Sequence, residues 1–161
     1  VAAGSRAALG EDPDASRGGE MRDLATVRLA LTAAETGHLV FGTLHTTSAP
    51  KTIDRIVDVF PAAEKEMVRA MLSESLQAVI SQTLLKKKGG GRVAAHEILI
   101  GTRAIRNLIR ENKIAQMRSA MQTGQADGMQ TLDQSLKGLI MKGLVDKNDA
   151  KRKADNPDSL N

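Results

Sequence analysis

The chain has 161 residues, of which 41% are hydrophobic and 26% charged, the size and composition of one globular domain rather than of a disordered chain. It contains no cysteine, and two phenylalanines are its only aromatic residues, which excludes thiolate chemistry and disfavours stacking on single-stranded nucleic acid. Basic and acidic residues, 23 and 19, are interleaved, as on a solvated surface. Without an apolar leader or transmembrane segment, the sequence predicts a cytoplasmic protein.

The predicted elements begin after residue 19. Residues 1–19 are rich in Gly, Ala and Ser, and residues 15–18 lack the hydrophobicity of a central strand, so we expect a loop-like or poorly ordered edge. Asp23 can cap a helix that ends near Gly37. The run 38–45 has apolar residues on both faces, which predicts a fully buried strand.

Helices and a hairpin follow. The hydroxyl residues 46–48 can cap a helix that Pro61 ends, and another helix comes after it. Residues 78–85 and 92–100 predict two strands, joined at Gly89–Gly91 because glycine readily adopts the positive φ of a tight turn.

The last third of the chain reads as helical. Helices are predicted near 103–111, 114–122 and 131–142, and the polar stretch 146–161 is expected to be a flexible tail. The order helix, strand, helix, strand pair and helices favours an α/β fold with a helical appendage.

Two groups of polar residues lie where an α/β fold binds ligands. His45 ends the predicted strand, and Thr46 begins the hydroxyl run that opens the next helix, so both are candidates for phosphate contacts. Glu20, Arg22 and Asp23 form a charged turn before a helix, where an acid either orients water or holds magnesium near a phosphate, or else complements the helix dipole. The residues alone leave these two alternatives open.

The sequence also predicts absences. No Gly-Lys dipeptide occurs, so the chain carries no Walker A phosphate loop, whose lysine follows a glycine directly. His38 and His45 are seven residues apart, which in a regular strand places them on opposite faces, and no metal site is predicted.

Three stretches resemble the PilT-type secretion and pilus-retraction ATPases. EDPD at 11–14 and GEMRD at 19–23 resemble that family's Walker B region, and residues 29–37 resemble the helix that follows it. GHLVFGTLHTTSA at 37–49 resembles its histidine box, and AIRNLI at 104–109 resembles the motif of its retraction members rather than of its secretion or assembly members. The resemblance covers roughly residues 11–145.

The resemblance implies an α/β fold, a partial RecA-like ATPase core without the Walker A half, followed by a helical C-terminal region. On this reading residues 1–19 are a truncated edge, 20–101 the C-terminal part of the core, 102–145 the helical region and 146–161 the tail.

The implied function is that of a fragment of a hexameric, ATP-hydrolysing motor for type IV pilus retraction and twitching motility. Glu20 would polarise the attacking water, and further residues would lie near the nucleotide or a subunit interface: Arg22, Asp23, His38, His45 and Thr46. The motif Ala104, Ile105, Arg106, Asn107, Leu108 and Ile109 would serve retraction.

The resemblance also implies ligands and partners. The complete protein would use ATP and Mg²⁺, neither of which we expect to bind tightly to this chain. Its partners would be further copies in a homohexamer and inner-membrane pilus-base proteins, with a peripheral position at the pilus base as an option. No nucleic acid is expected.

The alternative is a non-catalytic binding or regulatory module of a pilus or type II secretion assembly. For either reading, Ile105, Leu108 and Ile109 are spaced as a packed helix stripe, which leaves Arg106 and Asn107 pointing toward solvent or a partner.

Overall fold

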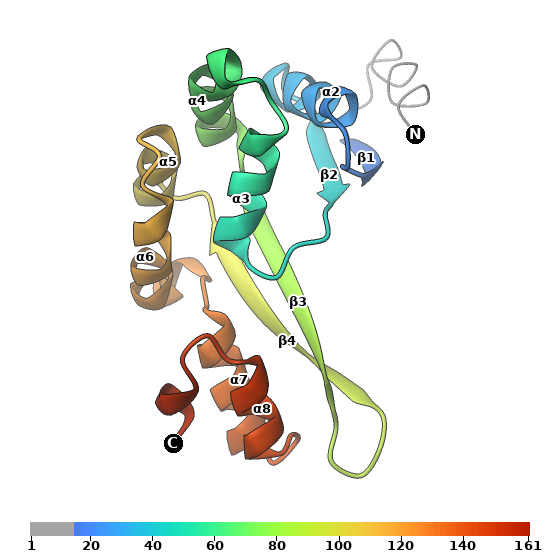
Figure 1. The fold of residues 1–161 in the computed structure, drawn as a ribbon, viewed down its shortest axis with the longest axis vertical. Helices are drawn as coiled ribbons and strands as arrows, with labels where there is room; N and C mark the ends of the chain where they lie inside the picture. The colour runs from blue at the N-terminus through green and yellow to red at the C-terminus, as the bar shows by residue number, and fades with distance from the viewer. Residues whose placement is uncertain (1–14) are drawn as a thin grey trace.

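The computed structural model describes residues 15–161, drawn in Figure 1. In chain order its elements are β1 (Ala15–Glu20), α2 (Leu24–Glu35), β2 (Leu39–Thr43), α3 (Ala49–Asp58), η1 (Ala62–Glu64), α4 (Lys65–Ser75), β3 (Ala78–Lys86), β4 (Arg92–Ile100), α5 (Arg103–Arg110), η2 (Ile114–Gln116), α6 (Met117–Thr123), η3 (Gln125–Asp127), α7 (Leu132–Met141), α8 (Lys147–Lys153) and η4 (Pro157–Leu160).

The first strand corrects one prediction. We expected residues 1–19 to be loop-like, but β1 pairs in parallel with β2, with a register irregularity between residues 17 and 20. Its backbone hydrogen bonds require no apolar side chains, and β1 pairs with β2 alone among the described residues, so it avoids the demands of a central strand. The expectation for residues 1–14 lies outside the described part of the chain.

The helix caps appear where the sequence predicts them. Asp23 accepts a hydrogen bond from the backbone N–H of Thr26 (2.8 Å) at the start of α2. Gly37 follows the end of α2 with φ +97°, a conformation that glycine adopts without steric cost. Ser48 accepts from the N–H of Lys51 (3.2 Å) and begins α3. Local hydrogen bonding therefore fixes both helix starts.

The strand β2 is not buried as predicted. Leu39 is 46% exposed and Phe41 59% exposed. Apolar residues on both faces predict burial only if other elements cover both faces, and among the described residues β2 pairs with β1 and packs mainly against α2. An exposed apolar strand remains.

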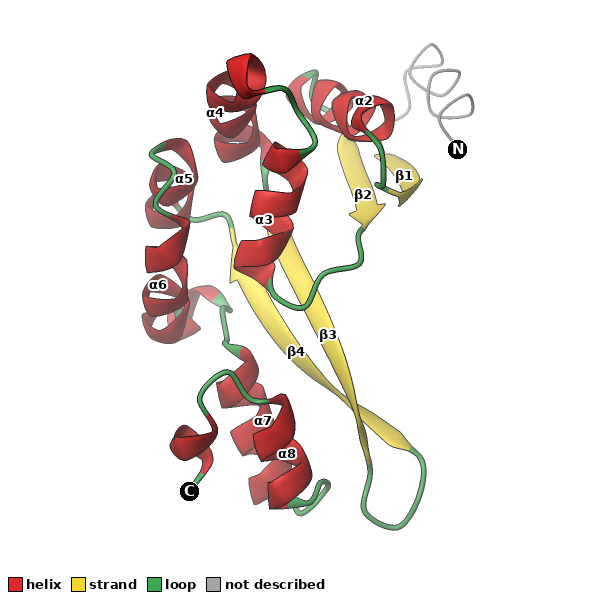
Figure 2. Ribbon diagram, in the orientation of Figure 1, coloured by secondary structure: helices red, strands yellow, loops and turns green. Residues whose placement is uncertain are grey.

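The strands β3 and β4 form the predicted antiparallel hairpin, in register from Ala78 opposite Ile100 to Lys86 opposite Arg92. Gly89, Gly90 and Gly91 all have positive φ at its turn. The helices α5, α6 and α7 lie along one side of this hairpin (Figure 2).

The C-terminal tail is a second correction. Residues 146–161 were expected to be flexible, but they form α8 and η4, and Leu160 is only 4% exposed. Asp133 on α7 accepts hydrogen bonds from the N–H groups of Asp155 (2.8 Å) and Asn156 (2.9 Å). Composition missed this packing because a few small or apolar residues, Ala150 and Leu160 among them, are enough to place a polar segment against the second core.

Two hydrophobic cores share β4. The first contains residues of α2, α3, α4, α5 and α6, together with Leu99. The second contains residues of α7, α8 and η4, together with Leu85 and Ala95. The helices α5 and α6 thus pack with the first core, although they lie in the predicted helical region 102–145. In residues 15–161, no helix is long and apolar enough to cross a membrane.

We predict that Leu160→Ala lowers the free energy of unfolding by about 2–5 kcal/mol, because it leaves a cavity in the second core. The control is Met141→Ala on α7, where the side chain is 80% exposed and the expected change is within about 0.5 kcal/mol. Urea unfolding of both variants gives the comparison. Equal stabilities would mean that the tail does not pack.

Candidate functional site

Parallel pairing brings Glu20 and His45 to the same end of the strand pair. Glu20 is the last residue of β1 and lies opposite Thr43, the last residue of β2. The N–H of Met21 donates to the carbonyl of Thr43 (2.7 Å), which closes the pair. His45 follows β2 by two residues, so both side chains lie at the carboxyl ends of parallel strands, the edge where α/β folds bind ligands.

Glu20 makes two charged contacts there. Its Oε2 lies 2.7 Å from Nη2 of Arg22, and its Oε1 lies 2.5 Å from Nε2 of His45. The contact with His45 is an ion pair when the imidazole is protonated. It does not count as a hydrogen bond, so Oε1 of Glu20 has no hydrogen-bond partner among the described residues. The Glu20 side chain is 28% exposed, against 74% for Arg22 and 81% for His45. A sheltered acid is therefore flanked by two solvent-facing basic groups.

These contacts lower the pKa of Glu20. The hydrogen bond from Arg22 is the main cause. Burial is the second-largest effect and opposes it, and the charges of Arg22 and then His45 add smaller lowering effects. The same pair raises the pKa of Arg22. Glu20 is therefore ionised at neutral pH and accepts hydrogen bonds.

The side chain of Asp23 is used at the start of α2, which is the structural alternative that the sequence left open for the acids of this turn. Its carboxylate caps α2, and the backbone hydrogen bond from Thr26 is the main reason that its pKa is lowered. Thr46 lies in the loop after β2, and its Oγ1 lies 2.6 Å from Oγ1 of Thr52 on α3. Asp23 is close to Glu20 in sequence, and Thr46 follows His45. Their side chains, however, form hydrogen bonds with residues of α2 and α3.

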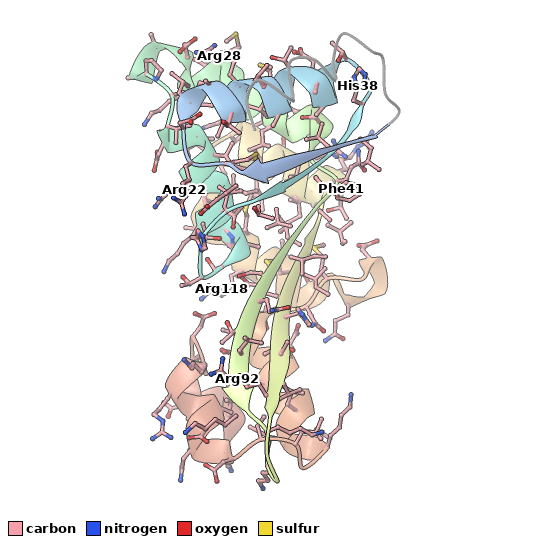
Figure 3. All side chains as sticks on the ribbon, turned by 90° about the vertical axis from the view of Figure 1, so that its right-hand side faces the viewer. Arg22, Arg28, His38, Phe41, Arg92 and Arg118 are labelled. Carbon is pink, nitrogen blue, oxygen red and sulfur yellow. The ribbon has the colours of Figure 1, made fainter. Side chains whose placement is uncertain are left out.

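His38 lies away from this site. It precedes β2, and its Nδ1 lies 3.1 Å from Oγ1 of Thr36 and 3.2 Å from the carbonyl of Ala33. Figure 3 shows His38 and Arg22 at opposite ends of the strand pair. Its predicted place near a nucleotide or subunit interface remains a prediction.

The motif 104–109 divides into two parts on α5. Ile105 and Ile109 are fully buried in the first core and Leu108 packs against it, as the spacing predicts. Ala104 and Asn107 are exposed. Helical periodicity therefore identified the packed face.

Arg106 does not point to solvent, which corrects the sequence prediction. Its Nε donates to the carbonyl of Gly101 (2.6 Å), and its Nη1 donates to the carbonyls of Ser73 (2.9 Å) and Glu74. Ser73 and Glu74 lie in the last turn of α4, whose unpaired carbonyls favour a cation. The long side chain thus reaches a neighbouring helix that periodicity does not reveal.

Metal binding has no support in the part of the chain that is described, where no group of three or more His, Asp or Glu side chains could hold an ion.

Sequence reasoning also missed Glu97, an acid that is 1% exposed in the middle of β4. Its position in the strand could have identified it, because Glu97 lies on the same face as Ala95 and Leu99, two residues from each, and this is the face that β4 buries.

Comparisons with known proteins show which family the chain resembles. Residues 1–89 match the family model described as type II/IV secretion system protein. The chain is 74% identical to the type IV pilus retractation ATPase PilT of Pseudomonas aeruginosa, over 96% of this chain and 45% of the relative. It is 69% identical to the twitching motility protein of Neisseria gonorrhoeae, over 95% of this chain and 41% of that relative.

Among solved structures, the chain is similar to a crystal structure of the pilus retraction motor PilT with bound ADP, with a TM-score of 0.89 and 56% identity over 99% of this chain and 45% of that one. It is also similar to the ATPase DotB of Legionella pneumophila, with a TM-score of 0.82 and 30% identity over 94% and 41% of the two chains. The chain spans less than half the length of each of these proteins.

We predict that Arg22→Ala raises the pKa of Glu20 toward its ordinary value, measured by ¹³C NMR of the side-chain carboxyl. Because Glu20 has a lowered pKa in the folded chain, its contacts stabilise the fold above the pKa of the unfolded chain, and this contribution is lost as pH falls through the folded pKa. Lys51→Ala, which removes a basic residue bound to Thr47 instead, is the control. An unchanged pKa in Arg22→Ala would contradict the assigned cause.

We predict that Arg106→Ala lowers the free energy of unfolding by about 1–3 kcal/mol, because carbonyls on α4 lose a charged donor. Asn107→Ala, on the exposed side of the same helix, should change it by less than about 0.5 kcal/mol. Thermal or urea unfolding separates the two. Similar losses would show that the guanidinium contacts do not stabilise α4.

Proposed function

The chain belongs to the family of type II/IV secretion system proteins, and from this premise we propose that it forms part of a homohexameric, ATP-hydrolysing motor that retracts type IV pili. The observation that carries the proposal is the ionised carboxylate of Glu20, held by Arg22 and His45 at the carboxyl ends of two parallel strands. The names of the relatives at 74% and 69% identity supply the pilus context.

Glu20 orients the water that attacks the terminal phosphate of ATP. A carboxylate accepts hydrogen bonds from water, and a positioned acceptor directs the lone pair of that water toward phosphorus. Because the pKa of Glu20 is lowered, it is a weak proton acceptor, so its contribution is orientation and polarisation more than complete proton removal. Arg22 forms a salt bridge with one of its oxygens, and His45 lies beside the other.

The sequence lacks the Walker A loop that holds the phosphates of ATP in P-loop enzymes. No Gly-Lys dipeptide is present to supply a phosphate loop, and the described residues offer no cluster of metal-binding side chains. The proposal is therefore that this chain contributes the water-orienting side of a site whose phosphate-binding side is built elsewhere. The exposed apolar strand β2, with Leu39 and Phe41, supports a further protein layer at this place.

The exposed part of the motif 104–109 is the proposed partner surface. Asn107 faces solvent, whereas Arg106 holds α4. We assign contact with inner-membrane pilus-base proteins to Asn107 and its exposed neighbours on α5, which places the motor on the cytoplasmic side of that membrane.

We predict that the chain by itself releases phosphate from ATP no faster than a heat-treated sample, because it lacks the loop and lysine that hold the phosphates. Joined to the remainder of the Pseudomonas aeruginosa relative in place of the matched part, it should hydrolyse ATP. Glu20→Gln should then lower kcat by about 10²–10⁴-fold, while Glu35→Gln on α2 leaves it unchanged. Full activity of the Glu20→Gln chimera would refute the assigned role.

We predict that Asn107→Ala in the same chimera keeps ATPase activity and impairs twitching in cells that lack their own retraction motor. Such a result separates partner contact from hydrolysis. Normal twitching by this variant, with expression equal to the parent chimera, would remove Asn107 from the partner surface.

A further inference from the structure

Glu97 occupies the boundary between the two hydrophobic cores. On the covered face of β4, Ala95 belongs to the second core and Leu99 to the first, and Glu97 lies between them with 1% exposure. A buried carboxyl is costly unless polar groups surround it. Its contacts therefore explain why an acid is accommodated at this position.

One carboxyl oxygen completes the start of α3. The N–H of Ala49, a residue with 0% exposure, donates to Oε2 of Glu97 at 2.7 Å. Pro50 has no N–H, and the N–H of Lys51 is capped by Ser48. Within this first turn Ala49 thus holds the one donor that the helix does not satisfy by itself, and Glu97 accepts it from a different element.

The start of α3 is also the end of the loop that carries His45. The five residues 44–48 connect β2 to α3. At one end, Thr43 is bonded to Met21, next to Glu20. At the other end, the bond from Ala49 to Glu97 ties the loop to β4. The His45–Glu20 contact therefore depends on where β4 holds α3.

The second core reaches the same carboxyl. Burial raises the pKa of Glu97, and the hydrogen bond from Ala49 is the largest effect that opposes it. The charge of Arg118 on α6 opposes burial as well, while the charge of Asp155, beyond α8, acts in the same direction as burial. The backbones of Ile98 and Gln130 exchange two hydrogen bonds, and Ser135 on α7 accepts from the N–H of His96. Residues on both sides of Glu97 are thus joined to the approach and first turn of α7.

The other carboxyl oxygen of Glu97 has no hydrogen-bond donor in the part of the chain that the structure describes. Oε1 of Glu97 is buried without a hydrogen-bond partner among the described residues, and so is Oγ of Ser81, the residue directly opposite on β3. Because Oε2 accepts from Ala49 while Oε1 accepts from no described residue, Glu97 can accept a further hydrogen bond on Oε1 without losing the one from Ala49.

We propose that Glu97 is a positioning residue, which holds the His45–Glu20 contact in place by tying the start of α3 to β4 and links that contact to the packing of α7. The role in hydrolysis rests on the proposed function, whereas the effect on the contact itself is a property of this chain alone. Glu97 touches none of the reacting groups and acts through His45.

The first experiment measures the contact in this chain by NMR. Glu97→Gln keeps an acceptor for Ala49 but replaces the ionisable carboxyl with an amide, so the Ala49 amide signal should move upfield and its hydrogen exchange should accelerate. Because the charge of His45 helps to lower the pKa of Glu20, a displaced His45 should let that pKa rise, while the larger effect of Arg22 persists. Glu64→Gln, which removes a carboxylate paired with Arg28 on α2, should change neither signal.

A double-mutant cycle tests the route through His45. In the His45→Ala background, Glu97→Gln should no longer change the pKa of Glu20, because the intermediary is gone. A changed Ala49 amide with an unchanged pKa of Glu20 would reduce Glu97 to a cap of α3 and overturn the proposal. Glu97→Asp, which keeps the carboxyl, serves if Glu97→Gln does not fold, and should give a smaller change in the same direction.

The second experiment uses the chimeric motor. If Glu97→Gln displaces His45 and with it Glu20, kcat should fall by about tenfold or more with little change in KM for ATP. Glu97→Asp should lose less activity than Glu97→Gln. A parent chimera without ATPase activity would contradict the proposed function and leave the NMR result to decide on Glu97. Equal kcat in the parent and Glu97→Gln would overturn the link to catalysis.

Discussion

The structure depends on β4 serving two hydrophobic cores at once. Leu99 packs among α2 to α6, and Ala95, four residues earlier on the same face, packs among α7, α8 and η4. Since close-packed interiors do not deform continuously, a displacement of this strand in one core is transmitted to the other. The polar residue between them, Glu97, binds the helix start that supports His45, so the site at Glu20 inherits its geometry from both cores.

The site itself is governed by charge placed at strand ends. Parallel pairing aligns the carboxyl ends of β1 and β2, and Arg22 and His45 then meet Glu20 from the two following loops. An acid between two basic groups stays ionised, which suits it to orient water. The chain thus presents a carboxylate paired with basic groups beside an exposed apolar strand, and its sequence contains no Gly-Lys dipeptide of a Walker A loop.

Features that depend on local hydrogen bonding were predictable. The caps at Asp23 and Ser48 and the glycine turn of the hairpin appear where the sequence places them, because each is formed by residues within a few positions of one another. Predictions failed where a side chain or segment reaches far along the chain. Arg106 binds carbonyls 32 and 33 residues away, and Leu160 anchors a tail whose composition alone is that of a solvated segment.

By itself, the sequence determined the helix starts, the hairpin, the packed stripe of Ile105 and Ile109, and the candidate acid at Glu20, because periodicity, capping and motif order are written in neighbouring residues. Only the tertiary structure decided that His45 meets Glu20 while His38 does not, and that Glu97 supports a helix in another part of the chain. These outcomes depend on which strands pair and which faces are covered, and such long-range choices are set by the packing of the whole chain rather than by any one segment.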